Sequence, residues 1–234
     1  MNAKAPSCSI ILPVLREASL VNDVIDHLRG LENNNETEII VVDGDPEGTT
    51  LTAITRDNVI KLGSPRGRGR QMNAGAREAK GKILLFLHAD TELPLNALRL
   101  IAAAMKDKRY VAGAFDLGIR SERLIFRLIE SAASLRSRAT RIPFGDQAIF
   151  VRKDYFEKIG GYKDIPIMED VEIMKRIKKR GDTILIVRQR VHTSSRRWEK
   201  EGILRCTLRN WLLQVLYLVG VSPHRFSKLY GHKQ

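Results

Sequence analysis

Two apolar runs of this chain each end in carboxylates. The run "IIVVDGD" ends in Asp43 and Asp45, and the run "ILLFLHAD" ends in Asp90. A buried carboxylate is costly unless a cation or hydrogen-bond donors meet it. In an open α/β sheet, the carboxyl ends of the strands border the crevice where ligands bind. The two runs therefore predict a site for a nucleotide and a divalent metal.

Asp90 is the expected metal ligand, and alternation along an extended chain places His88 on the same side. Carboxylate and diphosphate oxygens together suit Mg²⁺ or Mn²⁺. One aspartate cannot hold such an ion alone, so the phosphates of a substrate would complete the shell. The alternative is that Asp90 only caps the next helix.

A glycine- and arginine-rich loop, "GSPRGRGRQMNAGA" at 63–76, contains Arg68, Arg70 and Asn73. Such a loop offers backbone N–H groups and guanidinium groups to an anion. It lacks the lysine pattern of a P-loop. A flexible nucleic-acid contact is the alternative, but the helical "QMNAGA" that follows favours an ordered phosphate or nucleotide contact.

Two later motifs carry acids. "FGDQAIFVR" at 144–152 contains Asp146 and Gln147 directly before a short strand, and "IMED" at 167–170 contains Glu169 and Asp170 at a helix start. Acids in a first helical turn also interact favourably with the helix dipole, which is the structural explanation for the second motif.

The segment "VHTSSRRW" at 191–198 combines a histidine with arginines and a tryptophan. His192 could be a further metal ligand, Arg197 could hold a diphosphate, and Trp198 could provide an aromatic wall for a sugar. A single histidine is more often structural than metal-binding, so that alternative stays open for His192.

The composition is globular and basic. Forty basic against 27 acidic residues among 234 give a net charge of +13, which predicts anionic partners. The two cysteines, Cys8 and Cys206, lie far apart and are expected to be buried in a reducing compartment. The start "MNAKAPSCSIILPV" has no secretory apolar region, so we expect a cytoplasmic protein.

Apolar periodicity predicts alternating strands and helices, which is typical of a mostly parallel, doubly wound α/β sheet. We expect strands at 9–12 (ending at Pro13), 38–42, 58–62, 82–87, 110–117 and 148–151, and an edge strand at 183–187. We expect helices at 18–31, 70–79, 95–105, 121–138 (capped by Ser121), 154–160 and 168–180.

A further helix contains "WLLQVLYLV" at 211–219 and is apolar on nearly every side. It is shorter than the roughly 20 residues that a membrane-spanning helix needs. Two interpretations stay open: packing on the main domain or on a second copy, and contact with the inner face of the membrane through an interfacial basic helix.

Taken in order, these segments resemble a family 2 glycosyltransferase of the GT-A fold. "SIILPVLREA" matches the first strand, "IIVVDGD" the nucleotide acid, "LFLHADTELP" the DXD region, "FGDQAIFVR" the acceptor loop and "MED" the base motif. The chain looks most like a short bacterial subgroup that ends in "RRW" and an apolar helix. The resemblance implies a Rossmann-like GT-A domain at 1–200 and a C-terminal apolar helix with a basic tail at 201–234.

The resemblance implies metal-dependent, inverting transfer from a nucleoside diphosphate sugar, first of all a UDP-sugar, to a hydroxyl acceptor that is lipid-linked or free. Asp170 would be the general base, and Asp90, with His192, would bind the metal. Nucleotide binding falls to Pro13, Glu17, Asp43, Asp45, Arg68, Arg70, Asn73 and His88. Contacts with the sugar, acceptor or diphosphate fall to Asp146, Gln147, Glu169, Arg197 and Trp198.

Two departures from the family pattern stand out. His88 takes the place of the first acid of the DXD motif, and Ser194 replaces the glutamine expected upstream of the arginine-tryptophan pair in processive enzymes. The first change leaves the ribose contact of this position open. The second argues against processivity.

Two other function classes compete with sugar transfer. Nucleotidyl transfer would need a glycine-rich, lysine-bearing motif near the first strand, and "ILPVLREASL" has none. A basic module that binds nucleic acid or an anionic membrane without catalysis would explain the charge, but not the ordered acids; nucleic acid is the less favoured partner.

Overall fold

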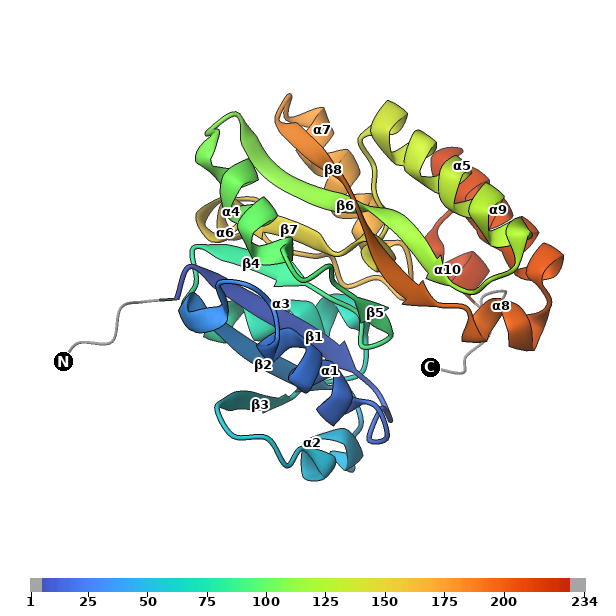
Figure 1. The fold of residues 1–234 in the computed structure, drawn as a ribbon. Helices are drawn as coiled ribbons and strands as arrows, with labels where there is room; N and C mark the ends of the chain where they lie inside the picture. The colour runs from blue at the N-terminus through green and yellow to red at the C-terminus, as the bar shows by residue number, and fades with distance from the viewer. Residues whose placement is uncertain (1–5, 228–234) are drawn as a thin grey trace.

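The computed structural model describes residues 6–227, and its centre is a sheet of eight strands (Figure 1). The strands are β1 (Cys8–Val14), β2 (Thr37–Asp43), β3 (Val59–Gly63), β4 (Ile83–Phe86), β5 (Thr91–Glu92), β6 (Tyr110–Arg120), β7 (Ile149–Arg152) and β8 (Thr183–Ser194). Their order across the sheet is β3-β2-β1-β4-β7-β6-β8-β5. The predicted α/β class is confirmed.

The chain changes direction across the sheet between β1 and β4. Strands β1, β2, β3 and β4 pair in parallel, and β1 lies between β2 and β4. Strand β7 is antiparallel to both of its neighbours, β4 and β6, whereas β6 and β8 are again parallel. The sheet is therefore mixed but mostly parallel, and the carboxyl ends of β1, β2 and β4 meet at one edge.

Helices cover both faces of the sheet and close an apolar core on each side. The helices are α1 (Val21–Arg29), α2 (Thr49–Ala53), α3 (Arg68–Glu78), α4 (Ala97–Lys106), α5 (Leu124–Thr140), α6 (Lys153–Lys158), α7 (Glu169–Lys179), α8 (Arg196–Glu201), α9 (Ile203–Leu218) and α10 (Pro223–Phe226). One core packs α1 and α4 on one face. The other packs α3, α6 and α7 on the opposite face. Both cores exclude water from the strands that lead to the polar edge.

Several predicted boundaries were wrong. Strand β8 is not an edge strand: it continues to Ser194, and β5 pairs with its second half. The polar "RQRVHTS" hides this extension from an apolar search. Strand β1 continues through Pro13 to Val14; its pairing with β4 has already ended at Ile11, so Pro13 pairs with β2 alone. Helix α5 begins at Leu124, and Ser121 does not cap it.

The C-terminal helices lie beside α5 at the end of the molecule remote from β3 (Figure 1). Leu213 of α9 and Phe226 of α10 are buried against Ile167, in the loop before α7. Across residues 6–227, no helix combines the length and apolarity that crossing a bilayer requires. The predicted basic tail lies largely outside the described residues.

Candidate active site

A cavity of about 200 Å³ opens beyond the end of β4. Its walls come from five parts of the chain: the start of α3, the segment after β4, the loop before β7, the start of α7, and the C-terminal helices. The lining side chains include Arg68, His88, Asp90, Asp146, Glu169, Asp170, Arg197, Trp198, Asn210 and Gln214. Segments far apart in the sequence thus bring carboxylates and guanidinium groups to one hollow.

Asp170 is held in a fixed orientation at the start of α7. Met168 takes a positive φ of 67° and turns the chain into the helix. One carboxylate oxygen of Asp170 accepts a hydrogen bond of 2.6 Å from the Gly145 N–H, and the other accepts one of 2.7 Å from the Val171 N–H. These donors fix the carboxylate at the cavity while leaving it lone pairs for a substrate.

Gln147 positions the loop that carries Asp146. Its side chain is fully buried, and its carbonyl oxygen accepts hydrogen bonds from the Ser137 hydroxyl (2.8 Å) and the Phe144 N–H (3.1 Å). Its amide nitrogen donates to the Phe115 carbonyl at 2.8 Å. We therefore correct the predicted substrate contact of Gln147: its polar groups are used to anchor the loop.

Burial raises the pKa of two carboxyl groups at the cavity. The pKa of Asp146 rises to about 6 because the group is buried, and the nearby charge of Asp170 adds to the shift. Burial also raises the pKa of Glu169, to about 7, although the charge of Arg68, 3.9 Å away, opposes the shift. Two carboxyl groups near Asp170 thus titrate close to neutral pH.

His88 is uncharged at neutral pH. Burial, with the positive charge of Arg68 adding to the shift, lowers its pKa to about 4. The imidazole lies against the loop before β7, where a Cβ at Gly145 would stand 2.9 Å from its Nε2 atom. A side chain at position 145 would therefore force the buried imidazole to shift. A neutral imidazole in place of an acid can hydrogen-bond a ligand but adds no negative charge.

Comparison with known proteins agrees with this geometry. The sequence model described as "Glycosyl transferase family 2" matches residues 9–161. The chain belongs to this family. A "Dolichol-phosphate mannosyltransferase" from Mycosarcoma maydis is 29% identical over 154 residues, which are 58% of this chain and 52% of that protein. This glycosyltransferase family 2 chain thus spans about half the length of the curated relative.

Two solved structures share the fold. A mannosyltransferase, PcManGT from Pyrobaculum calidifontis in complex with GDP-Man and Mn²⁺, has a TM-score of 0.70 at 19% identity and covers 95% of this chain and 67% of its own. TarS 1–349 from S. aureus in complex with UDP has a TM-score of 0.62 at 15% identity, covering 80% of this chain and 60% of its own. The predicted GT-A fold of this family 2 chain is confirmed.

The cavity of this family 2 chain fits a metal that is completed by substrate oxygens. Asp90 lines it, its charge raises the pKa of Asp146, and Oδ1 of Asp146 is buried without a hydrogen-bond partner among the described residues. Within residues 6–227, no group of three His, Cys, Asp or Glu residues could hold a metal by itself. Hard carboxylate oxygens beside room for a diphosphate suit Mg²⁺ or Mn²⁺.

The structure does not bring His192 to Asp90. His192 is exposed on β8 opposite Glu92, and it lines a separate hollow with His27 and Arg188. We therefore correct the prediction that these two residues share a metal. The prediction was wrong because β8 continues further than expected. Its pairing with β5 turns the His192 imidazole toward the other hollow.

The predicted nucleoside acids Asp43 and Asp45 lie at and just after the end of β2, and neither lines the cavity. Asp43 is fully buried and accepts hydrogen bonds from the N–H groups of Asp45 (2.9 Å) and Thr50 (3.1 Å). Asp45 accepts one from the Thr49 hydroxyl at 2.6 Å. Both acids therefore shape the loop that leads into α2.

Glu17 connects this edge to the cavity. Its carboxylate lies 3.8 Å from Arg196, and its pKa is raised by burial, with Arg196 opposing and the charge of Asp90 adding to the shift. Pro13 is buried in β1, near the start of the same loop. Glu17 is therefore close enough to Arg196 and to Asp90 to respond to the charges of both.

Two predicted nucleotide contacts in α3 have other partners. Arg70 binds both oxygens of Asp164, at 2.8 and 2.6 Å. Asn73 donates to the Tyr162 carbonyl (2.8 Å) and accepts from the Tyr162 N–H (2.9 Å). Arg70 and Asn73 thus tie α3 to the segment before α7, while Arg68 faces the cavity.

Sequence reasoning missed several residues that support the site. Gln71 donates from one amide to the carbonyl oxygens of Val14 (2.7 Å) and Val42 (2.8 Å), so it bridges the ends of β1 and β2. Arg136 of α5 lies 3.4 Å above the Phe144 ring, and burial lowers its pKa to about 10. The "RQMN" next to the arginine-rich loop was the available signal for Gln71; Arg136 gave none.

Trp198 joins the cavity to the C-terminal helices. Its ring packs edge-on against Phe126 at 5.9 Å, and its indole nitrogen is buried without a hydrogen-bond partner in the part of the chain that the structure describes. Asn210 of α9 lines the same cavity, and its Oδ1 atom is likewise buried without a hydrogen-bond partner among the described residues. A bound polar group would satisfy both atoms.

Proposed function

We propose that this chain transfers a sugar from a nucleoside diphosphate sugar to a hydroxyl acceptor, with inversion at the anomeric carbon. One observation carries the proposal: Asp90, Asp146 and Asp170 share a cavity with Arg68 and Arg197. Carboxylates can hold a metal and accept a proton, and guanidinium groups match the oxygens of a diphosphate. The family membership favours this reaction over nucleotidyl transfer.

Asp170 is the proposed general base. The acceptor oxygen attacks the anomeric carbon while its proton passes to the Asp170 carboxylate. The bond from that carbon to the diphosphate oxygen breaks, and its electron pair leaves with the nucleoside diphosphate. A single displacement needs one positioned base, and the N–H donors of Gly145 and Val171 supply that positioning.

Arg68 and Arg197 would stabilise the negative charge that grows on the leaving diphosphate. Asp90, with the unpartnered oxygen of Asp146, would hold Mg²⁺ or Mn²⁺. The ion would supply further neutralisation of the leaving group. Glu17, Asp43 and Asp45 would border the nucleoside, and Trp198 and Asn210 the acceptor or the transferred sugar. A UDP-sugar is the first donor to test, and GDP-sugars are the second.

Thermal denaturation with UDP or GDP, each with and without Mn²⁺, tests this proposal. We expect one nucleoside diphosphate to raise the melting temperature only when Mn²⁺ is present, and Asp90→Asn to lose this effect. An Arg70→Ala variant is the matched control, because Arg70 pairs with Asp164 outside the cavity. Indifference of the wild type to every nucleotide would overturn the proposal.

A further inference from the structure

Helix α5 turns polar side chains toward the sheet and leucines away from it, which is the reverse of what is expected for a helix that only covers a domain. Ordinarily the apolar stripe faces inward. In α5 the fully or nearly fully buried positions are Phe126, Glu130, Ser134 and Ser137. Its leucines point outward instead: Leu124, Leu128 and Leu135 are 81%, 67% and 69% exposed. The outward face is therefore apolar without contributing to the core of this domain.

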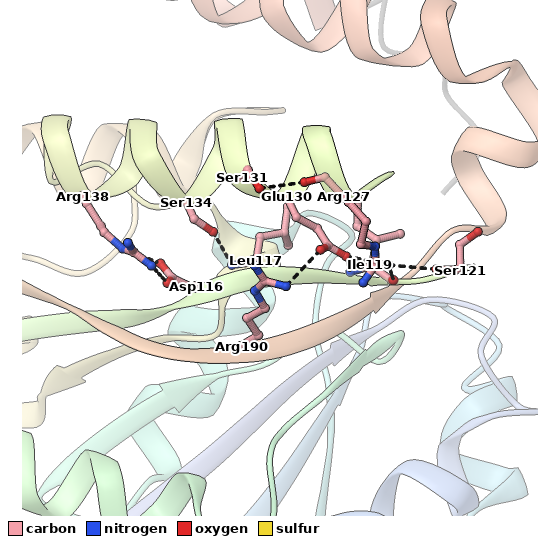
Figure 2. Close-up of polar contacts among 10 residues, drawn as sticks. All are labelled: Asp116, Leu117, Ile119, Ser121, Arg127, Glu130, Ser131, Ser134, Arg138 and Arg190. Carbon is pink, nitrogen blue, oxygen red and sulfur yellow. Dashed lines mark hydrogen bonds and ion pairs between the residues drawn. The ribbon is translucent and has the colours of Figure 1, made fainter. Parts of the chain in front are cut away.

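Polar contacts, rather than leucines, attach α5 to the sheet (Figure 2). Glu130 accepts a hydrogen bond from the Ile119 N–H at 2.7 Å, and the Ser134 hydroxyl accepts one from the Leu117 N–H at 3.3 Å. Glu130 also pairs with Arg190 at 3.3 Å. These bonds hold the helix in place on β6, so its leucines are available to another phase or partner.

Helix α9 lies against α5 and exposes a second apolar stripe. Ile203, at the start of α9, packs on the cluster that contains Phe126, and Arg136 donates to Gln214 at 3.4 Å. The exposed side chains of α9 recur at helical spacing. We call them, with those of α5, the α5/α9 surface: Leu124, Leu128, Leu135, Leu204, Leu208, Trp211, Leu212, Val215 and Leu218.

We propose that the α5/α9 surface docks on an anionic lipid membrane. Residues 121–141 contain five arginines and two glutamates, and residues 196–225 contain six lysines and arginines and two glutamates. Both segments therefore carry net positive charge, with Arg123, Lys200, Arg205 and Arg225 among their exposed cations. A second copy placed on this surface would bring like charges together, which is unfavourable. Anionic lipids supply an apolar layer and the opposite charge together.

The exposure of Trp211 also favours a membrane as the partner of this surface. This side chain is 58% exposed in the middle of the α9 stripe. Tryptophan favours the boundary between lipid headgroups and acyl chains, where its ring is buried and its N–H stays hydrated. In a protein that met only water, this ring would be an unusual surface residue among four exposed leucines of the same helix.

Flotation with phosphatidylcholine vesicles, with and without phosphatidylglycerol, tests the proposal on the full chain. We expect binding only when phosphatidylglycerol is present, weakening with salt, together with a blue shift of tryptophan emission. A Trp211→Phe variant should lose that shift. Leu128→Glu and Leu208→Glu should each lower the partition coefficient by about tenfold, because each removes buried apolar area.

Leu95→Glu is the matched control, since Leu95 is a 58% exposed leucine that lies outside the α5/α9 surface, before α4. It should bind vesicles like the wild type. Melting curves and the nucleotide-dependent melting shift should be unchanged in Leu128→Glu, which separates docking from sugar transfer. Absence of binding to phosphatidylglycerol vesicles, or a dimer that Leu128→Glu and Leu208→Glu both dissociate, would overturn the proposal.

Discussion

The sheet region from β1 to β4 and the region of helices α5 and α9 differ in which side chains they bury. In the first, apolar side chains such as Ile10, Ile40 and Leu85 are fully buried, and the polar groups gather at the strand ends. In the second, Glu130 and Ser137 of α5 are fully buried and the leucines of that helix are outside. The first region buries its apolar side chains within the domain, whereas the second leaves an apolar surface exposed, which we propose contacts a membrane.

The difference teaches that a helix can be held in place by hydrogen bonds while its apolar side serves another surface. A buried polar group is tolerated when its donors and acceptors are satisfied, and Glu130 meets this condition through the Ile119 N–H and Arg190. Apolar periodicity alone therefore does not reveal which face of α5 is the inner one. The cavity lies between the two regions, and the predictions below test each side of it.

The largest effect is expected at the boundary of the two regions. Asp170→Asn should lower transfer by about 10³-fold, because the acceptor proton loses its base, while the nucleotide-dependent melting shift stays. Steady-state kinetics and melting curves measure the two properties on the same variant. Near-normal turnover of Asp170→Asn would remove Asp170 from the role of base.

The second prediction contrasts the cores. Phe150→Ala should lower the free energy of unfolding by about 4 kcal/mol, because Phe150 is fully buried in β7 against Phe115. Leu128→Ala, also a truncation to alanine but on α5, should change it by less than about 0.5 kcal/mol. Urea denaturation in the absence of lipid gives both values. Equal losses would show that the outer face of α5 is covered within the protein itself.

The third prediction concerns the polar attachment of α5. Glu130→Ala should cost about 2 kcal/mol, because the buried Ile119 N–H loses its acceptor and Arg190 and Arg127 lose an ion pair. Glu122→Ala is the control, since Glu122 is exposed just before the helix and should have almost no effect. Hydrogen exchange of the Ile119 amide should quicken only in Glu130→Ala; an unchanged rate would contradict the attachment.

The smallest effect is expected from pH. Burial raises the pKa of Glu169 from 4.5 to about 7, so folding disfavours its ionised form, and wild-type stability falls as pH rises from about 4.5 through 7. Glu169→Gln cannot ionise and should escape this loss. Its melting temperature relative to wild type should rise between pH 5 and pH 8 by about 3 °C. A difference independent of pH would show that Glu169 has an ordinary pKa.

Local patterns in the sequence are sufficient to predict much of the first region. The runs around Ile10, Ile40 and Leu84 are buried strands, and the acids that follow them lie at the shared strand edge. The helix that starts at Glu169 was also expected. These features depend on neighbours in the sequence, so periodicity and turn residues are enough to find them.

The rest depends on partners that are distant in the sequence. The extension of β8 to Ser194 is stabilised by pairing with β6 and β5 rather than by its own apolarity. Gln71 is recognisable only when the two carbonyls that it bridges are known, and the assignment of His192 to the metal failed because β8 continued. The departure at His88 was visible, but its neutral charge follows from burial and Arg68.

The loop before β7 connects α5 to Asp170 through hydrogen bonds. The Ser137 hydroxyl of α5 holds Gln147, Gln147 holds the Phe144 N–H, and the next N–H, that of Gly145, holds the Asp170 carboxylate. A tilt or shift of α5 would therefore be passed on to Asp170, the carboxylate proposed to accept the proton. Any force that a lipid surface exerts on α5 would reach the base through three hydrogen bonds, so that docking and turnover would be tuned by the same short chain of contacts.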